Sequence, residues 1–334
     1  MLEIEQKSIC FAAPLQLSSG REIERPCVAW KTWGQLNAAR DNAILICHAL
    51  SGSADVDAWW PGIIGPNGAF DPSKYFLIAS NVLGGCYGSS GPRDGATSED
   101  AFPKISIGDM VALQARLIDH LGVRSLRLVV GASMGGMQAL EWAYREPELV
   151  RAIAPLCCPA RQSAQALALN ALQIAAIKAD PHNGLRLARQ MGLLTYRSFE
   201  DFEERFGRER RADGHYQVLS YLEHHGNKFI ERFDPISYVR LTEAMIDWDI
   251  GHARGGTESA LARIQQPALV LSIASDQLYL PREQQLLARH LPNGQLKTIE
   301  SRYGHDGFLV ELDQVAPLLR DFLERQAPLA SRVA

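Results

Sequence analysis

Long apolar runs mark the buried strands of this chain. They are Ala43–Cys47, Tyr75–Ala79, Leu126–Val130 and Ala268–Ile273, and each is nearly continuous rather than alternating. Strands covered on both faces of a parallel sheet have this pattern, because neither face is left for polar side chains. The shorter and more polar run Leu296–Ile299 is typical of an outer strand. The N-terminal stretch up to Cys10 alternates charged with apolar residues, so it is predicted to be a first strand.

Amphipathic helical patterns lie between these runs. In the segment Ile107–Leu121 the apolar side chains fall near one helix face, and Gly122 is suited to end that helix. Further helices are predicted at Met137–Arg145 and Val315–Arg325. Because strands alternate with helices, the sequence predicts an α/β fold with a doubly wound, mostly parallel sheet.

Residues 161–256 break this alternation and show only helical periodicity. Helices are predicted at Ser163–Lys178, Gly184–Leu194, Phe199–Phe206, Tyr216–Phe229 and Pro235–Trp248. Asp234 is a suitable N-cap for the last of them, because a proline follows at the first helical position. The segment Gly251–Gly256 indicates a hinge or linker. We therefore predict a catalytic domain from residues 1–160 and 257–334, with a helical cap inserted at residues 161–256.

Composition and charge exclude several classes of function. The 334 residues are 46% hydrophobic and 22% charged, with a formal net charge of -4, which disfavours nucleic acid as a partner. No apolar run reaches the about 20 residues that a membrane span needs. No basic start followed by an apolar stretch is present, so no secretory leader is expected and the cytoplasm is the predicted location. Neither nucleotide-binding glycine motifs nor a metal-ligand cluster is recognisable, so no bound cofactor or metal is expected.

The cysteines do not suggest a metal or redox site. The six are Cys10, Cys27, Cys47, Cys86, Cys157 and Cys158, and none of them forms a C-x-x-C pair. Several lie inside apolar runs, so free buried thiols are expected rather than disulfides. Free thiols are consistent with a reducing cytoplasm.

The segment Gly131–Gly136 carries the strongest chemical signal. It contains G-x-S-x-G around Ser133, directly after the run Leu126–Val130 and before a predicted helix. Between a strand and a helix this motif places the serine on a sharp turn, where small neighbours are required because backbones approach closely. The helix N-terminus helps to stabilise developing negative charge. The alternative is a glycine-rich turn without chemistry. With Ser133 as nucleophile, the fold is predicted to be that of an α/β-hydrolase.

A serine nucleophile needs a base, and the base needs an orienting acid. In the α/β-hydrolase fold the chain order is serine, then acid, then histidine. Asp276 follows the strand Ala268–Ile273, at the strand end where such sheets place their sites. His305 follows the outer strand and precedes the last helix. Asp276 could instead cap a helix, and Asp313 is a weaker candidate for the acid because it follows the histidine.

The oxyanion hole is predicted from the same fold logic. One donor is the N–H of Met134, the residue after the nucleophile. The second comes from the loop after Ala43–Cys47, where Leu50 and Ser51 are the candidates and Leu50 is favoured.

Segments across nearly the whole chain share their sequence with one enzyme family. They are Thr32–Val56, Tyr75–Pro92, Val129–Ala143, Gly184–Ser198, Ser220–Met245 and Tyr303–Glu311. The stretch VLGGCYGSSGP and the motifs of the predicted cap are particular to that branch rather than general to the fold. On these residues the chain resembles the homoserine O-acetyltransferase family, a branch of the α/β-hydrolases.

The resemblance implies a reaction, substrates and an assembly. An acyl-CoA, preferably acetyl-CoA, acylates Ser133, and the hydroxyl of L-homoserine then attacks the seryl ester in a ping-pong reaction with His305 as base. This would be the activating step of methionine synthesis from homoserine. The resemblance also implies a homodimer built through the cap helices.

Substrate contacts can be transferred from the family where the motifs match. Arg189 matches the arginine that holds the carboxylate of the amino acid, and a guanidinium is a good fork for a carboxylate. Asp306 matches the residue that meets the amino group, and Tyr196 matches a tyrosine of the pocket. The alternatives are a solvated helix arginine for Arg189 and a helix N-cap for Asp306.

Other substrates and activities stay open at this point. Some family members use succinyl-CoA and some acylate serine, and Arg93 is a candidate cation for a succinyl carboxylate, although it could also be a surface arginine beside Asp94. An esterase, or a binding protein of the same fold without catalysis, are the remaining alternatives.

Overall fold

A mostly parallel sheet forms the centre of the molecule. The computed structural model describes residues 5–92 and 102–326. The strand order of the eight-stranded sheet is β1-β4-β6-β5-β7-β8-β9-β10. The strands are β1 (Lys7–Cys10), β4 (Cys27–Trp33), β5 (Ala43–Cys47), β6 (Phe76–Ser80), β7 (Leu126–Ala132), β8 (Ile153–Leu156), β9 (Ala268–Ile273) and β10 (Gly294–Ile299). Only the pairings of β4 with β1 and β6 are antiparallel within this sheet. The short strands β2 (Leu15–Gln16) and β3 (Glu22–Ile23) form a separate antiparallel pair.

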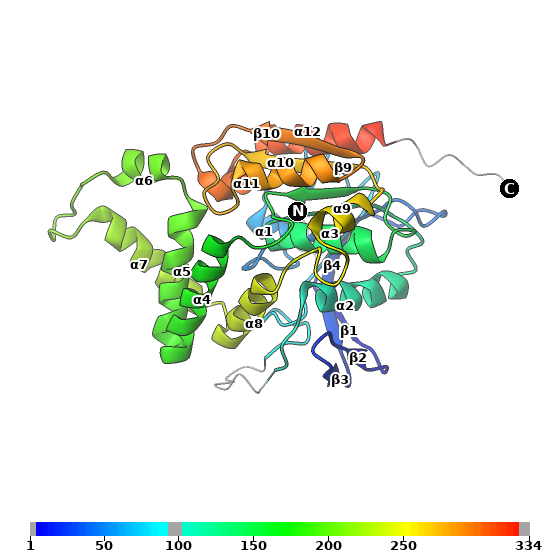
Figure 1. Cartoon of the computed structure of the whole chain (residues 1–334), viewed down its shortest axis with the longest axis horizontal. Helices are drawn as coiled ribbons and strands as arrows, with labels where there is room; N and C mark the ends of the chain where they lie inside the picture. The colour runs from blue at the N-terminus through cyan, green and yellow to red at the C-terminus, as the bar shows by residue number, and fades with distance from the viewer. Residues whose placement is uncertain (1–4, 93–101, 327–334) are drawn as a thin grey trace.

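Both faces of the central strands are buried, as the continuous apolar runs predicted. Along β5, Leu45 belongs to one apolar cluster, whereas its neighbours Ile44 and Ile46 belong to the other. The first cluster receives side chains from α2 (Ile107–His120), α3 (Met134–Arg145), α9 (Thr257–Ala262) and α10 (Pro281–His290). The second receives them from α1 (Val56–Trp59) and α12 (Leu312–Arg325), which lies on the opposite side of the strands from α2 (Figure 1). The doubly wound α/β prediction is confirmed.

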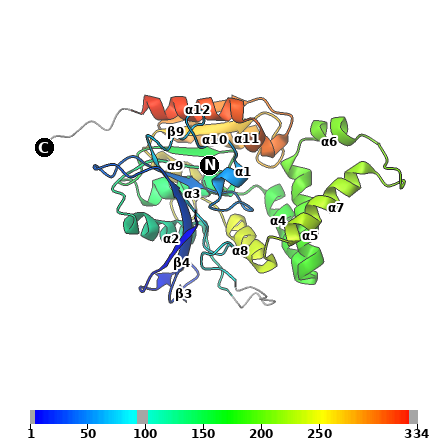
Figure 2. The ribbon, with the colours of Figure 1, turned by 180° about the vertical axis from the view of Figure 1, so that it is seen from behind.

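We call the eight-stranded sheet and the helices that cover it the sheet domain. A group of helices projects from one side of it. It comprises α4 (Ala164–Ala179), α5 (Pro181–Tyr196), α6 (Phe199–Phe206), α7 (Gln217–Ile230) and α8 (Pro235–Ile246), and we call it the cap (Figures 1 and 2). The side chain of Asp234 accepts a hydrogen bond from the Ser237 N–H at 2.6 Å, so the predicted N-cap of α8 is formed. Apolar side chains of α4, α5, α7 and α8 join the first apolar cluster of the sheet domain. The division into separate domains at residues 161 and 256 stays a prediction.

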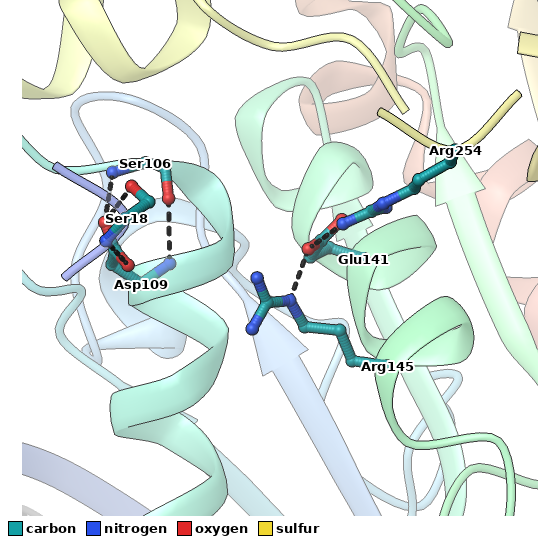
Figure 3. A network of polar contacts seen from close by, with 6 residues as sticks. All are labelled: Ser18, Ser106, Asp109, Glu141, Arg145 and Arg254. Carbon is teal, nitrogen blue, oxygen red and sulfur yellow. Dashed lines mark hydrogen bonds and ion pairs between the residues drawn. The ribbon is translucent and has the colours of Figure 1, made fainter. Parts of the chain in front are cut away.

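Polar contacts attach the segment Gly251–Gly256, which follows the cap, to α3, the helix that follows Ser133. Arg254 lies in the predicted linker Gly251–Gly256, and its two Nη atoms donate to both oxygens of Glu141 on α3 at 2.8 and 2.7 Å (Figure 3). Asp109 of α2 makes a comparable anchor nearby, because its carboxylate accepts hydrogen bonds from Ser18 and Ser106 (Figure 3). The bidentate pair with Glu141 attaches the linker firmly to α3.

The expectation that all cysteines are free is wrong for one pair. Cys10 and Cys27 face each other in the antiparallel register of β1 and β4, and their sulfur atoms are bonded. Spacing along the chain could not reveal this pairing, because it depends on the strand register. The other four cysteines are free, and three of them are buried. The argument for a reducing compartment from free thiols therefore loses part of its basis.

Two strands of the eight-stranded sheet, and the short pair β2 and β3, were missed by the apolar pattern. β8 has four residues and contains Pro155, and β4 carries the polar residues Lys31 and Thr32, so neither stands out as a continuous apolar run. Across residues 5–92 and 102–326, no helix is long and apolar enough to cross a membrane. The same residues contain no group of three or more His, Cys, Asp or Glu side chains that could hold a metal ion.

The backbones of β5, β7 and α3 meet without room for side chains. A Cβ atom on Gly135 of α3 would lie 2.1 Å from the carbonyl oxygen of Cys47 at the end of β5. A Cβ atom on Gly131 would lie 2.5 Å from the carbonyl carbon of Gly135. Glycine is therefore required at both positions, because the atoms in the way belong to the backbone.

We expect Gly135→Ala to lower the free energy of unfolding by about 3 kcal/mol, because neither backbone can move aside without displacing the centre of the sheet. Urea denaturation followed by tryptophan fluorescence measures this loss. Gly85→Ala is the control, since its Cβ would meet nothing closer than the Val82 carbonyl oxygen at 3.2 Å, and it is expected to cost under about 1 kcal/mol. Equal midpoints for the two variants would contradict the close approach.

Candidate active site

Ser133 occupies a strained turn between β7 and α3. Its φ and ψ are 56° and -122°, in a region that residues with a side chain rarely adopt. The Ser133 N–H donates to the Leu156 carbonyl of β8 at 2.9 Å, which fixes the turn against the sheet. Strain of this kind persists only where the surrounding structure imposes it, and it is common at active sites. The predicted strand-turn-helix context of the nucleophile is therefore present.

Asp276 and His305 are joined directly. Nδ1 of His305 and Oδ2 of Asp276 lie 2.7 Å apart, and both side chains are buried. The other carboxylate oxygen of Asp276 accepts hydrogen bonds from the N–H groups of Leu278 and Tyr279, both at 2.9 Å. Asp276 thus accepts local backbone hydrogen bonds with one oxygen and contacts the imidazole of His305 with the other. Asp313 lies at the start of α12 instead.

The environment of His305 favours its charged form. Burial of the ring lowers its pKa, but the charge of Asp276, the hydrogen bond to it and the charge of Asp306 outweigh burial, so that the pKa lies above the ordinary 6.5. Three aromatic rings surround the imidazole, those of Tyr279, Phe308 and Tyr196, at centroid distances of 5.3, 5.8 and 6.2 Å. Nε2 of His305 is buried and has no hydrogen-bond partner among the described residues, so it is available to a reacting group.

Ser133, His305 and the predicted substrate residues line one cavity of about 130 Å³. Arg189 and Tyr196 reach it from α5 of the cap, whereas Asp306 and Leu50 reach it from loops of the sheet domain. This volume is small beside the several hundred Å³ of pockets for drug-sized ligands, so the cavity suits a small metabolite. Residues spread from position 50 to position 306 of the chain are brought together here.

Arg189 is held between aromatic rings. Its guanidinium carbon lies 5.7 Å from the ring centroid of Tyr196 and 5.2 Å from that of Phe229. The side chain is half-buried rather than solvated, in contrast to the alternative of a surface arginine. A guanidinium stacked on aromatic faces keeps its N–H fork free to receive a carboxylate.

Asp306 lies beside the base and faces the cap. Burial raises the pKa of its carboxyl group, although the charges of Arg197, His305 and Arg189 act in the opposite direction. Arg197 of the cap places its Nε 3.1 Å from Oδ2 of Asp306. Asp306 precedes the short helix α11 (Gly307–Val310) but makes no side-chain capping bond to it, so the N-cap alternative is not supported.

One predicted oxyanion donor follows Ser133 in the chain, and the other lines the same cavity as Ser133. Met134 begins α3, so its N–H is among the first N–H groups of the helix, which have no partner within the helix. Leu50 lies in the loop after β5 and lines the cavity together with Ser51, so the choice between these two donors stays open.

Two buried polar residues support this loop. The Nδ1 of His48 bonds the Ala49 carbonyl at 2.7 Å, its Nε2 accepts from the Val82 N–H at 3.2 Å, and burial lowers the pKa of His48 to about 4. Nε2 of Gln138 on α3 lies 3.4 Å from the His48 carbonyl oxygen and 3.2 Å from that of Met134. Sequence reasoning did not identify these roles, because a buried glutamine and a neutral histidine carry no motif. Arg93, the candidate succinyl contact, lies outside the described residues.

Comparisons with known proteins agree with the geometry. A family profile described as alpha/beta hydrolase fold matches residues 42–312. A homoserine O-acetyltransferase of Chlorobium luteolum (strain DSM 273 / BCRC 81028 / 2530) is 44% identical over 342 residues, which cover 97% of this chain and 96% of that protein. A homoserine O-acetyltransferase of Trichormus variabilis (strain ATCC 29413 / PCC 7937) is 46% identical over 328 residues, which cover 92% of this chain and 91% of that protein.

Solved structures share the fold over almost the whole length. The homoserine O-acetyltransferase of Staphylococcus aureus is 28% identical with a TM-score of 0.83, covering 96% of this chain and 95% of that one. An acetylester hydrolase from Corynebacterium glutamicum is 27% identical with a TM-score of 0.85, covering 96% of both chains. The fold is therefore shared by transferases and hydrolases, and the sequence relatives decide between them at the level of the family. Because those relatives are more than 40% identical over nearly its whole length, the chain belongs to the homoserine O-acetyltransferase family, acyltransferases of the α/β-hydrolase superfamily.

Proposed function

We propose that this enzyme transfers an acyl group, preferably acetyl, from acyl-CoA to the side-chain hydroxyl of L-homoserine by a ping-pong reaction. The observation that carries the proposal is the 44 and 46% identity to named homoserine O-acetyltransferases over nearly the whole chain, cap included. We further propose that the reaction serves methionine synthesis in the cytoplasm.

The first half-reaction forms a seryl ester. Nε2 of His305 takes the proton of the Ser133 hydroxyl while Oγ attacks the thioester carbonyl. Asp276 holds the imidazole in orientation through Nδ1 and stabilises its positive charge. The N–H groups of Met134 and Leu50 receive the negative charge that develops on the carbonyl oxygen. The carbon–sulfur bond then breaks, and the thiol of CoA leaves with the proton from His305.

The second half-reaction repeats these steps with the amino acid as acceptor. The unpartnered Nε2 of His305 takes the proton of the homoserine hydroxyl, whose oxygen attacks the seryl ester. Ser133 leaves with that proton, and the O-acyl amino acid is released. Ser133 is only 8% exposed, which supports transfer, because a seryl ester at this depth is shielded from bulk water.

Opposite charges in the wall of the cavity suit an α-amino acid. The guanidinium of Arg189 would hold the carboxylate, and the carboxylate of Asp306 would receive the ammonium group. Tyr196 would stand between them, because its ring contacts both Arg189 and His305. The presence of both charges supports an amino acid over an uncharged alcohol as the acceptor.

Two alternatives use the same chemistry. A succinyl donor or L-serine as acceptor would keep every catalytic role and change only the pocket contacts. A hydrolase, in which water replaces the amino acid, has specific support in the esterases that share the fold, such as the acetylester hydrolase with a TM-score of 0.85.

We predict that purified enzyme releases CoA thiol from acetyl-CoA only when L-homoserine is present. Ser133→Ala should lower this rate by about 10³-fold or more, because no seryl ester can form. A thiol-reactive dye follows the release, with acetyl-CoA or succinyl-CoA crossed against L-homoserine, L-serine or water. Release only with succinyl-CoA, or only with L-serine, would assign a different donor or acceptor and leave the mechanism unchanged. Release that does not depend on any amino acid would establish a hydrolase instead.

We predict an acidic limit to activity that is set by His305. The base must be neutral to accept a proton, so the rate should fall as the pH drops through its pKa, which lies above 6.5. Asp306→Asn removes a negative charge that raises the pKa of His305, so the acidic limb of the acylation step should move to lower pH. The burst of p-nitrophenol from p-nitrophenyl acetate measures this step. Asp313→Asn is the control and should leave the limb in place; an unchanged limb in Asp306→Asn would refute the assignment.

We propose that the enzyme is a homodimer joined through the cap helices. Large apolar side chains are exposed on α4, α5 and α7, including Leu172 at 62%, Leu194 and Leu219. Uncovered apolar area of this kind is typical of an interface.

Light scattering is expected to give twice the chain mass of 36.9 kDa. Leu172→Glu should raise the dimer dissociation constant by at least about tenfold, because the new carboxylate loses its hydration in the interface. Leu286→Glu on α10 is the matched control, as Leu286 is 40% exposed but lies outside the cap. A monomeric wild-type protein, or equal effects of both variants, would contradict a dimer through the cap.

A further inference from the structure

Arg197 connects the cap to the loop that carries the base. It is the C-cap residue that follows α5, and its Nε lies 3.1 Å from Oδ2 of Asp306. Its Nη1 lies 3.6 Å from Oδ2 of Asp201 on α6, and its guanidinium carbon lies 5.4 Å from the ring centroid of Tyr303. Arg197 thus joins two carboxylates and an aromatic ring from both parts of the molecule.

The backbone around Arg197 is held closely against the same loop. Gly304, two residues before Asp306, has a φ of +64°, and a Cβ there would lie 2.8 Å from the carbonyl carbon of Arg197. The hydroxyl of Ser198 donates to the carbonyl oxygen of Arg302 in the loop. The position of the Arg197 side chain relative to Asp306 is therefore fixed by main-chain packing as well as by charge.

The pair leaves Asp306 able to accept from a ligand. Nε of Arg197 has no aligned hydrogen bond among the described residues, although it lies 3.1 Å from the carboxylate, so the contact is one of charge. Asp306 is part of the cavity wall, whereas Arg197 is not among the described residues that line the cavity. Arg197 therefore stands behind Asp306 and meets the substrate only through it.

We propose that Arg197 is a positioning residue for acceptor selection, holding the Asp306 carboxylate at the cavity wall as the receptor for the ammonium group of the amino acid. The inference rests on the proposed function, because it concerns how that acceptor is recognised. Arg197 lies at the junction of α5 and α6. The acceptor site would therefore be formed by the cap as well as by the loop that carries His305.

The charges around Asp306 define what Arg197 contributes. The groups that face it are Arg197 and Arg189 from the cap, and His305 and Asp276 from the sheet domain. Burial raises the pKa of Asp306, and Arg197 is the first of the charges that lower it. Without this cation the carboxyl group keeps its proton to a higher pH, and a protonated carboxyl group is a poor receptor for an ammonium group.

The test is the separate kinetics of the two half-reactions in Arg197→Gln. The KM for L-homoserine should rise about tenfold or more, as expected for loss of a charged partner. The burst from p-nitrophenyl acetate, measured at a pH above the pKa values of both His305 and Asp306, should stay unchanged. The acidic limb of kcat/KM for homoserine should move to higher pH. Arg197→Lys keeps the charge, so its KM and its acidic limb should lie close to those of the wild-type enzyme.

Arg302→Gln is the matched control. Arg302 lies over the same Tyr303 ring at 5.1 Å and pairs with Glu204, so it resembles Arg197 without an ion pair to Asp306. Its removal should leave the KM for homoserine unchanged.

A double-mutant cycle separates positioning from general damage to the fold. In the Asp306→Asn background, Arg197→Gln should have no further effect on the KM, because it acts only through the carboxylate. An additive effect of the two changes, or an unchanged KM in Arg197→Gln alone, would overturn the proposal. Homoserine-dependent release of CoA by the wild-type enzyme is measured before any variant is compared. If this release is absent, the proposed function is wrong, and that result is distinct from a failure of the role proposed for Arg197.

Discussion

The approach of α3 to the end of β5 is the constraint on which the rest of the site depends. Because Gly131 and Gly135 have no side chain, the backbone of α3 lies so close to the end of β5 that a Cβ atom on either glycine would clash. Ser133 occupies the turn between them in a strained conformation. That turn places the serine, the start of α3 and the loop after β5 in one small volume. The nucleophile and both candidate oxyanion donors therefore have their positions set by the same contact.

Negative charge around His305 is the second organising feature. Asp276 is buried, orients the imidazole and raises its pKa, while Asp306 raises it further from the neighbouring position. One carboxylate is committed to the base by a direct hydrogen bond, and the other is left at the cavity wall. Two carboxylates next to one histidine thus have different partners: Asp276 is bonded to the imidazole, and Asp306 is paired with an arginine of the cap. Their proposed roles differ accordingly.

The cap provides the cavity residues that we propose as contacts for the acceptor. The sheet domain provides the predicted nucleophile, base, acid and oxyanion donors, which by themselves support transfer to water as well as to an alcohol. Arg189, Tyr196 and Arg197 all lie on or at the end of α5, and they add the charges that an amino acid would recognise. Hydrolases and transferases share this fold, so the fold alone does not select the acceptor.

The sequence by itself determined the fold class, the parallel strands and the residues of the nucleophile turn. Continuous apolar runs and G-x-S-x-G depend on local contacts and on burial of both sheet faces, and these leave a signal at each position. The short β8, the polar β4 and the bond between Cys10 and Cys27 left no such signal, because they depend on neighbours distant in the chain.

Only the tertiary structure decided which charges meet. The roles of His48, Gln138 and Arg197 arise from contacts between segments far apart in the sequence, and no local pattern distinguishes these side chains from others of their type. A catalytic serine can be recognised because its turn imposes rules on its neighbours. A positioning arginine cannot, because its role is defined by the distance to a carboxylate more than one hundred positions away, and that distance exists only once the cap has packed on the sheet domain.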